Sequence, residues 1–194
     1  MLKQGLKNGL LNAIVSVGWT HKIQEKQAER YAAFEKNWTM LQLLSAGLTA
    51  TGTFAVLISD THISKVLTVI VGLISFVSSG VLKASNFKSL ATESKEYANK
   101  QFQLREMLMD CLRDLAFGLK PLDNIQERWE LLESKRLSMG ASVPATSDSA
   151  VSKASFQLKR RRDNVTDTDY ELFISKDILN ELCKSDSKKG DSND

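Results

Sequence analysis

Two uncharged stretches that lie close together in the chain limit what this protein can fold into. Residues 37–59 and residues 66–82 contain no Asp, Glu, Lys or Arg. As helices they would be about 34 Å and 26 Å long, lengths that bracket the roughly 30 Å hydrocarbon core of a bilayer. Lys65 and Lys83 flank the second stretch and can extend toward the headgroups. We therefore expect transmembrane helices over 37–59 and 66–82.

The other interpretation of these stretches is a buried helical hairpin inside a soluble bundle. A surface helix of a domain this small normally keeps a charged face, and neither stretch offers one. Trp38, at the start of the first stretch, is a residue type that is enriched at membrane interfaces. Both features favour two membrane spans over a soluble hairpin.

The connection between the two stretches, residues 60–65, is short enough to make them antiparallel neighbours. Its only basic residue is Lys65. Many basic residues precede the first span or follow the second: Lys22, Lys26, Arg30, Lys36, Lys83, Lys88, Lys95, Lys100 and Arg105. Since basic residues concentrate on the cytoplasmic side, we expect an external hairpin at 60–65 and both termini in the cytoplasm.

Residues 1–36 are predicted to form amphipathic and cytoplasmic helices. One helical face carries Leu2, Leu6, Leu10, Ile14 and Val17. The apolar run is weak and no small-x-small cleavage site follows it, so we favour a helix on the membrane or on the bundle over a signal peptide. No Pro or Gly separates residues 20–36 from the first span, so this helix should continue into it.

Residues 83–138 are predicted to form cytoplasmic helices. The apolar positions of a heptad seam are Phe87, Leu90, Tyr97, Leu104, Leu108 and Leu115, and Ser94, Gln101 and Cys111 complete its 3-4 spacing. The seam predicts one long helix from about Lys83 to Phe117, packed on residues 20–36 or on another subunit. Gly118 and Pro121 should end it, and a short helix over about 122–138 should fold back.

The last third of the chain is polar. Residues 139–168 are rich in Ser, Ala, Thr and Asp and include the basic run 159–162, which predicts a flexible basic linker that is solvated or touches anionic lipid. Capping-box spacing from Thr168 to Glu171 predicts a short amphipathic helix over 169–184 that docks on a partner or on the bundle. Residues 185–194 should be disordered.

The sequence offers little chemistry. His21 and His62 fall on opposite sides of the proposed membrane, and no phosphate-binding loop, nucleophile motif or metal-ligand spacing is present. A net charge of +3 with no aromatic platform gives no indication of nucleic acid binding. We expect no enzyme activity, no catalytic residue, no metal site and no cofactor.

The polar residues inside the spans are the candidate site. They recur on one face of each span: Gln42, Ser45, Thr49 and Thr53 in the first, and Thr68, Gly72, Ser75 and Ser79 in the second. Small and hydroxylated residues allow membrane helices to pack closely and to hydrogen-bond. The same stripes could instead line a water-filled path between the hairpins of several subunits, because two helices cannot enclose a pore alone. The sequence leaves both interpretations open.

This layout resembles the SLATT domain, a two-transmembrane effector domain of bacterial conflict systems. The resemblance covers roughly residues 18–135 and rests on residues 19–23, on the helix from Gln24 to Lys36, and on the pattern Phe87, Tyr97-Ala98 and Leu104 after the second span. The linker and the 169–184 helix lie outside it. The resemblance implies an all-α membrane protein with a two-helix transmembrane hairpin, an N-terminal amphipathic helix and a long cytoplasmic helix.

The same resemblance implies a function. An effector of this kind would oligomerise in the bacterial inner membrane, form a pore or perturb the bilayer, and limit phage spread. It would be switched on by a cytoplasmic sensor, such as a nucleotide-generating or nucleotide-sensing enzyme or a reverse transcriptase. The alternative is a membrane anchor or scaffold that presents a cytoplasmic coiled coil to a partner protein.

Overall fold

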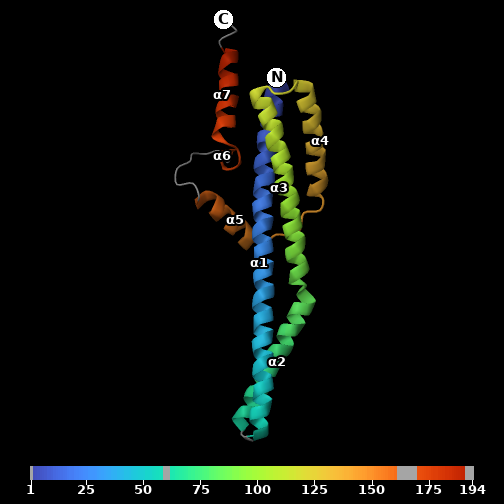
Figure 1. Ribbon diagram of the computed structural model, residues 1–194, viewed down its shortest axis with the longest axis vertical. Coiled ribbons are helices and arrows are strands. Elements are labelled where there is room, and N and C mark those ends of the chain that lie inside the picture. The colour runs from blue at the N-terminus through green and yellow to red at the C-terminus, as the bar shows by residue number, and fades with distance from the viewer. Residues whose placement is uncertain (1, 59–61, 161–169, 191–194) are drawn as a thin grey trace. The chain divides into compact units, whose positions relative to one another are not determined.

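The computed structural model describes residues 2–58, 62–160 and 170–190, and all regular secondary structure in these residues is α-helical (Figure 1). The helices are α1 (Leu2–Ile58), α2 (His62–Ser85), α3 (Phe87–Phe117), α4 (Leu122–Gly140), α5 (Asp148–Arg160), α6 (Tyr170–Phe173) and α7 (Lys176–Gly190). They form two compact units, residues 1–26 with 94–194, and residues 27–93. We call these the bundle and the hairpin.

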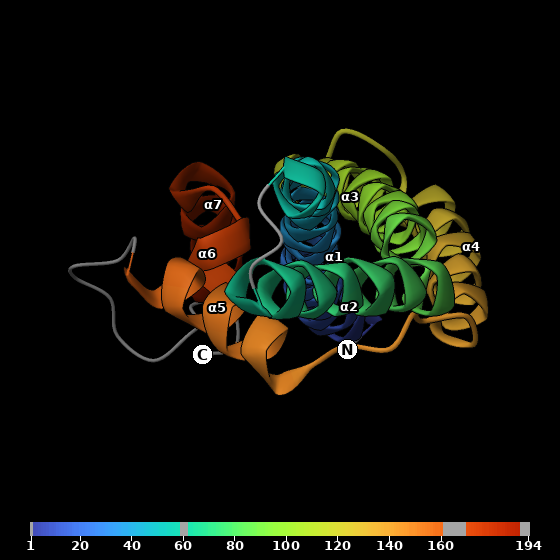
Figure 2. The same cartoon turned by 90° about the horizontal axis from the view of Figure 1, so that it is seen from below.

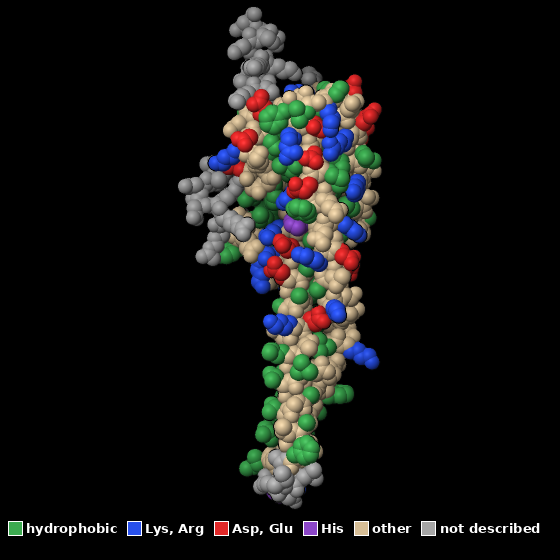
Figure 3. Space-filling view, in the orientation of Figure 1, with side chains coloured by type: hydrophobic (Ala, Val, Ile, Leu, Met, Phe, Trp, Pro, Cys, Tyr) green, Lys and Arg blue, Asp and Glu red, His purple; other side chains and the backbone are tan. Residues whose placement is uncertain are grey.

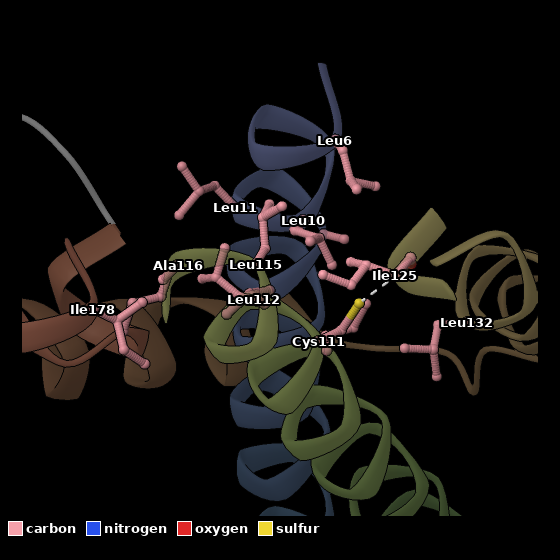
Figure 4. Close-up of a cluster of buried hydrophobic side chains, with 14 of the residues drawn as sticks. Leu6, Leu10, Leu11, Cys111, Leu112, Leu115, Ala116, Ile125, Leu132 and Ile178 are labelled. Atoms are coloured by element: carbon pink, nitrogen blue, oxygen red, sulfur yellow. Dashed lines mark hydrogen bonds between the residues drawn. The ribbon is translucent and has the colours of Figure 1, made fainter. Parts of the chain in front are cut away.

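The bundle is built on the N-terminal part of α1 and on α3. Figure 1 and Figure 2 show α4 on one side of α1 and α5 to α7 on the other. Its core contains the apolar face of α1 (Leu6, Leu10, Ile14, Val17), the seam of α3 (Leu104, Leu108, Leu115), and Ile125 and Leu132 of α4 (Figure 4). The N-terminal helix therefore packs on the bundle, and its residues 6–17, rather than the predicted 20–36, form the main apolar partner of the seam.

Polar members of the seam are satisfied inside the bundle. Gln101 Nε2 donates to the Tyr97 hydroxyl over 2.8 Å, and that hydroxyl reaches the Met139 carbonyl over 3.2 Å. Burial raises the pKa of Tyr97, although the hydrogen bond from Gln101 acts in the opposite direction. These two hydrogen bonds connect α3 to the end of α4 through the Tyr97 hydroxyl.

The stop signals after the seam act as predicted. Gly118 has a φ of +63°, the left-handed conformation that ends many helices, and α4 starts directly after Pro121. Cys111 lies in the core, and burial raises the pKa of its thiol. It packs there as a small apolar side chain.

The predicted flexible linker at 139–168 is wrong over much of its length, because α4 extends to Gly140 and α5 covers Asp148–Arg160. Ala150 and Ala154, four residues apart, are fully buried. Their methyl groups let α5 lie close to its neighbours, and Ala is the strongest helix former. Residues 161–169 lie outside the described part of the chain.

The predicted single helix over 169–184 is two helices, α6 and α7, and α7 continues through six residues of the predicted disordered tail. Ser175 precedes α7, and Ser is a favoured residue at the start of a helix. Its carbonyl accepts a hydrogen bond from Leu179 N in the first turn of α7. Ile174, Ile178 and Leu182 are buried in the bundle core. Residues 168, 169 and 191–194 lie outside the described residues.

The hairpin contains residues 27–58 of α1, all of α2 and the first turns of α3. The predicted unbroken helix from Lys83 to Phe117 is interrupted at Asn86, which has a φ of +44°. Asn tolerates this left-handed conformation better than other residues with a side chain. The helix over residues 20–36 continues into the first predicted span, as expected, because both belong to the 57-residue α1.

Candidate functional site

The hairpin exposes apolar side chains along both of its helices. On α1 they include Leu43, Leu44, Leu48 and Phe54, and on α2 they include Val66, Leu67, Leu73 and Phe76. Phe54 is 68% exposed and Phe76 is 78% exposed, whereas soluble proteins rarely leave large contiguous apolar surfaces in water. Figure 3 shows hydrophobic side chains and few charges over α2 and the C-terminal half of α1.

One helix of the described residues, which begins at His62, is long and apolar enough to cross a membrane by length and composition. Only 6% of its most apolar window is buried. A core helix of a soluble protein would be mostly buried. The low burial of this window therefore argues against the soluble interpretation of the stretch. Of the predicted external hairpin, residues 60–65, residues 60 and 61 lie outside the described residues, and residues 62–65 instead form the first turn of α2.

The two polar stripes face each other inside the hairpin. Gln42 Nε2 donates to Ser79 Oγ over 2.9 Å. A Cβ built on Gly72 would lie 3.9 Å from Thr49 Cγ2, and one built on Gly52 would lie 2.7 Å from Thr68 Oγ1. As the α1 position rises from 42 to 49 to 52, the α2 partner falls from 79 to 72 to 68, so one antiparallel register extends along the pair.

The hydroxyl groups of the stripes are already satisfied by their own helices. Thr49 donates to the Ser45 carbonyl, Thr68 to the Ser64 carbonyl and Ser79 to the Ser75 carbonyl, each over 2.8 Å. Such bonds to the carbonyl four residues earlier use the one donor of each hydroxyl within its own helix. The geometry places Gln42, Thr49, Thr68, Gly72 and Ser79 at a helix–helix contact within the hairpin.

The predicted stripe residues differ in exposure. Ser45 is buried, Thr53 is exposed, and the others are half-buried: Gln42, Thr49, Thr68, Gly72, Ser75 and Ser79. Two residues of the contact were not predicted, Gly52 and the fully buried Ser78, whose hydroxyl donates to the Ile74 carbonyl over 2.7 Å. Ser79 continues the helical spacing of Thr68, Gly72 and Ser75, whereas its neighbour Ser78 does not.

An aromatic cluster lies at the base of the hairpin, beside the first residues of α3. The Phe87 ring lies 6.5 Å from Tyr31 and 5.7 Å from Phe34, centroid to centroid. The Arg30 guanidinium lies 5.2 Å from the centre of the Phe34 ring. Phe87 follows the break at Asn86 directly, so the seam position predicted to join a coiled coil instead fastens α3 to α1 at the base of the hairpin. Leu90, the next seam position, is half-buried.

The described residues hold no group of three or more His, Cys, Asp or Glu side chains that could bind a metal ion. His21 is engaged in the bundle, where its Nδ1 lies 2.9 Å from the Ala98 carbonyl. His21 belongs to the bundle and His62 begins α2 in the hairpin.

Comparison with protein families gives a match over most of the chain. The model of SMODS and SLOG-associating 2TM effector domain family 4 matches residues 6–171. This match extends beyond the predicted range of 18–135 at both ends and includes the region predicted as a linker outside the domain. No curated protein and no solved structure matches the chain.

Proposed function

Because the chain belongs to the SMODS and SLOG-associating two-transmembrane effector domain family, we propose that it is a membrane-embedded effector that oligomerises and permeabilises the bacterial inner membrane. The uncovered apolar surface of the hairpin is the observation that carries this proposal, since lipid is the partner that such a surface requires. In this proposal α1 from residue 37 and α2 both cross the bilayer.

The hairpin register supports two spans of matched length. Ser79 of α2 pairs with Gln42 of α1, so Lys83 lies near the level of Trp38 and Lys36. From that level, both helices extend about 30 Å to the tip, which equals the hydrocarbon thickness. Basic residues at the base and Trp38 beside them favour a cytoplasmic base, with both termini inside the cell.

The unit of assembly in this proposal is the intact hairpin. Gly47 and Thr51 lie on an exposed face of α1, and a Cβ built on Gly47 would meet nothing within 4 Å. Small residues on lipid-facing helices permit close approach of a neighbouring helix. The exposed face of Gly47 and Thr51, rather than the packed residues of the stripes, is therefore our candidate for the surface between subunits.

A partner in the cytoplasm supplies the signal in this proposal. The family description names an association with SMODS and SLOG proteins, and the bundle carries most of the charged residues that a cytoplasmic partner could contact. The packed stripes also support a second candidate, a membrane anchor, since an anchor needs tight helix packing and no path for ions.

Replacement of the hairpin separates the two candidates. The native protein is expressed in bacteria together with its neighbouring genes and their trigger, and membrane potential is followed with a voltage-sensitive dye. An effector depolarises the cells, and replacement of residues 37–82 by an unrelated two-span hairpin abolishes depolarisation. If the replaced protein acts as well as the native one, the hairpin only anchors the chain. Absence of any effect of the native protein on potential or growth contradicts the effector proposal.

A further inference from the structure

The bundle contains a basic cavity of about 220 Å³ whose lining residues come from helices far apart in the sequence. His21 and Lys22 of α1, Arg105 of α3, Gln157 of α5 and Phe173 of α6 contribute to its walls. All of these residues belong to the bundle, so the cavity is independent of the hairpin and of the membrane proposal.

The imidazole of His21 is held in place by its neighbours. Its Nδ1 lies 2.9 Å from the Ala98 carbonyl, which can only accept, so Nδ1 carries the proton. The ring centre lies 5.7 Å from that of Phe102. With Nδ1 donating to that carbonyl, Nε2 is the ring nitrogen left for a ligand, and in the neutral imidazole it accepts a hydrogen bond.

The two permanent cations of the cavity are also held in position. Lys22 Nζ lies 2.7 Å from Glu25 Oε2, and Arg105 Nη2 lies 2.8 Å from Glu106 Oε1. The Arg105 guanidinium lies 5.0 Å from the centre of the Phe102 ring, which fixes its plane. One carboxylate cannot use all the N–H donors of a guanidinium or an ammonium group, so donors remain on both side chains. Glu106 would compete with a bound anion for Arg105. Because 54% of its side chain is exposed to solvent, it is a weaker competitor for Arg105 than a buried carboxylate would be.

The wall opposite these donors is aromatic. A Cβ on Gly18 would overlap the Phe173 ring, so only glycine permits this close approach of α6 to α1. Trp19 contacts the same ring edge-on, with 6.4 Å between the centroids. A ligand in the cavity would therefore contact α1 and α3 through the cations and α6 through Phe173.

We propose that this basic cavity binds a small phosphorylated ligand, with Lys22 and Arg105 as donors to its phosphoryl oxygens and His21 beside them. Two cations that reach the cavity from two helices suit an anion with several oxygens, and a guanidinium matches two of them at once. A volume near 220 Å³ is below the usual range for drug-sized ligands, so the ligand is an inorganic phosphate, a small phosphate ester or part of a nucleotide.

The test uses the full chain in detergent micelles and isothermal titration calorimetry at constant ionic strength. Inorganic phosphate and AMP are the probes. We expect saturable binding, weakened about tenfold or more by Arg105→Gln and by Lys22→Gln, because each removes charge-assisted hydrogen bonds. The matched control is Arg113→Gln, which removes a cation from the same helix that is half-exposed and paired with Asp110.

The outcomes separate the sources of the phosphoryl group. Tighter binding of AMP than of phosphate, lost in Phe173→Leu, indicates a nucleotide whose base contacts the aromatic wall. Equal affinities indicate a free oxyanion or a simple ester. The proposal is overturned if neither probe binds saturably, or if Arg113→Gln weakens binding as much as Arg105→Gln does. Unchanged thermal unfolding of the unliganded variants shows that a loss of binding is not a loss of fold.

Discussion

The packed contact between α1 and α2 can be tested at Gly52. In Gly52→Ala the new Cβ would lie 2.7 Å from Thr68 Oγ1, a distance that real Cβ atoms essentially never show. Thr68 cannot simply rotate away, because it is β-branched and its hydroxyl donates to the Ser64 carbonyl over 2.8 Å. Relief requires either loss of that bond or a shift of the helices. Overpacking of this kind costs about 1–3 kcal/mol.

Gly47→Ala is the matched control, because it makes the same chemical change in the same helix where the Cβ meets nothing within 4 Å. Both variants gain the same intrinsic helix propensity, about 1 kcal/mol in water. The difference between them therefore isolates the contact with Thr68. We expect Gly52→Ala to unfold at a lower SDS mole fraction in mixed micelles than Gly47→Ala. Equal midpoints for the two variants would refute the register of the hairpin.

Two further predictions concern the bundle. Leu182→Ala, at a fully buried site of α7, should destabilise the bundle by about 2–5 kcal/mol and raise hydrogen exchange of the α7 amides, whereas Val151→Ala, at a partly exposed site of α5, should cost far less. The bidentate pair from Arg136 to Glu133 lowers the pKa of Glu133, so its stabilisation is present above the unfolded pKa of that carboxyl and is lost as pH falls through the folded value. Arg136→Gln should therefore reduce the melting temperature at pH 7 more than at pH 3, and equal losses at both pH values would contradict this assignment.

Charge and helical periodicity predicted the apolar hairpin and the buried face of α3, but not the helices that pack on that face. The missing charges at 37–59 and 66–82 identified the apolar surface, and the absence of Pro and Gly between residues 20–36 and the first span predicted the continuity of α1 there. The 3-4 spacing predicted the buried face of α3, since Tyr97, Leu104, Leu108 and Leu115 are all buried. These signals are averages over several turns, which makes them robust to single residues.

Features that depend on one or two side chains were not predictable in the same way. Asn86 interrupts the helix through a left-handed φ, and nothing in its neighbours marks that conformation. Helix α5 buries Ala150 and Ala154, whose methyl groups give almost no apolar periodicity. Which residues of the two stripes meet depends on the rotation of α1 against α2, which the period of each helix alone does not define.

The packed stripes also constrain how the hairpin could act. Opening it would separate Gln42 from Ser79, and an amide left without a partner in hydrocarbon costs several kcal/mol. Assembly of intact hairpins avoids this cost. Intact hairpins are therefore the expected active form, and a covalent lock between the helices should leave activity unchanged.

The geometry provides such a lock. A Cβ on residue 52 would lie 3.6 Å from Thr68 Cβ, within the range that a disulfide requires, so Gly52→Cys with Thr68→Cys should crosslink α1 to α2. Exposed Cys183 is replaced by Ser, whereas Cys111 is buried and can remain. Gly47→Cys with Thr68→Cys is the control that should stay reduced. If the oxidised lock abolishes depolarisation and a reductant restores it, hairpin opening is part of the mechanism and assembly of intact hairpins is wrong.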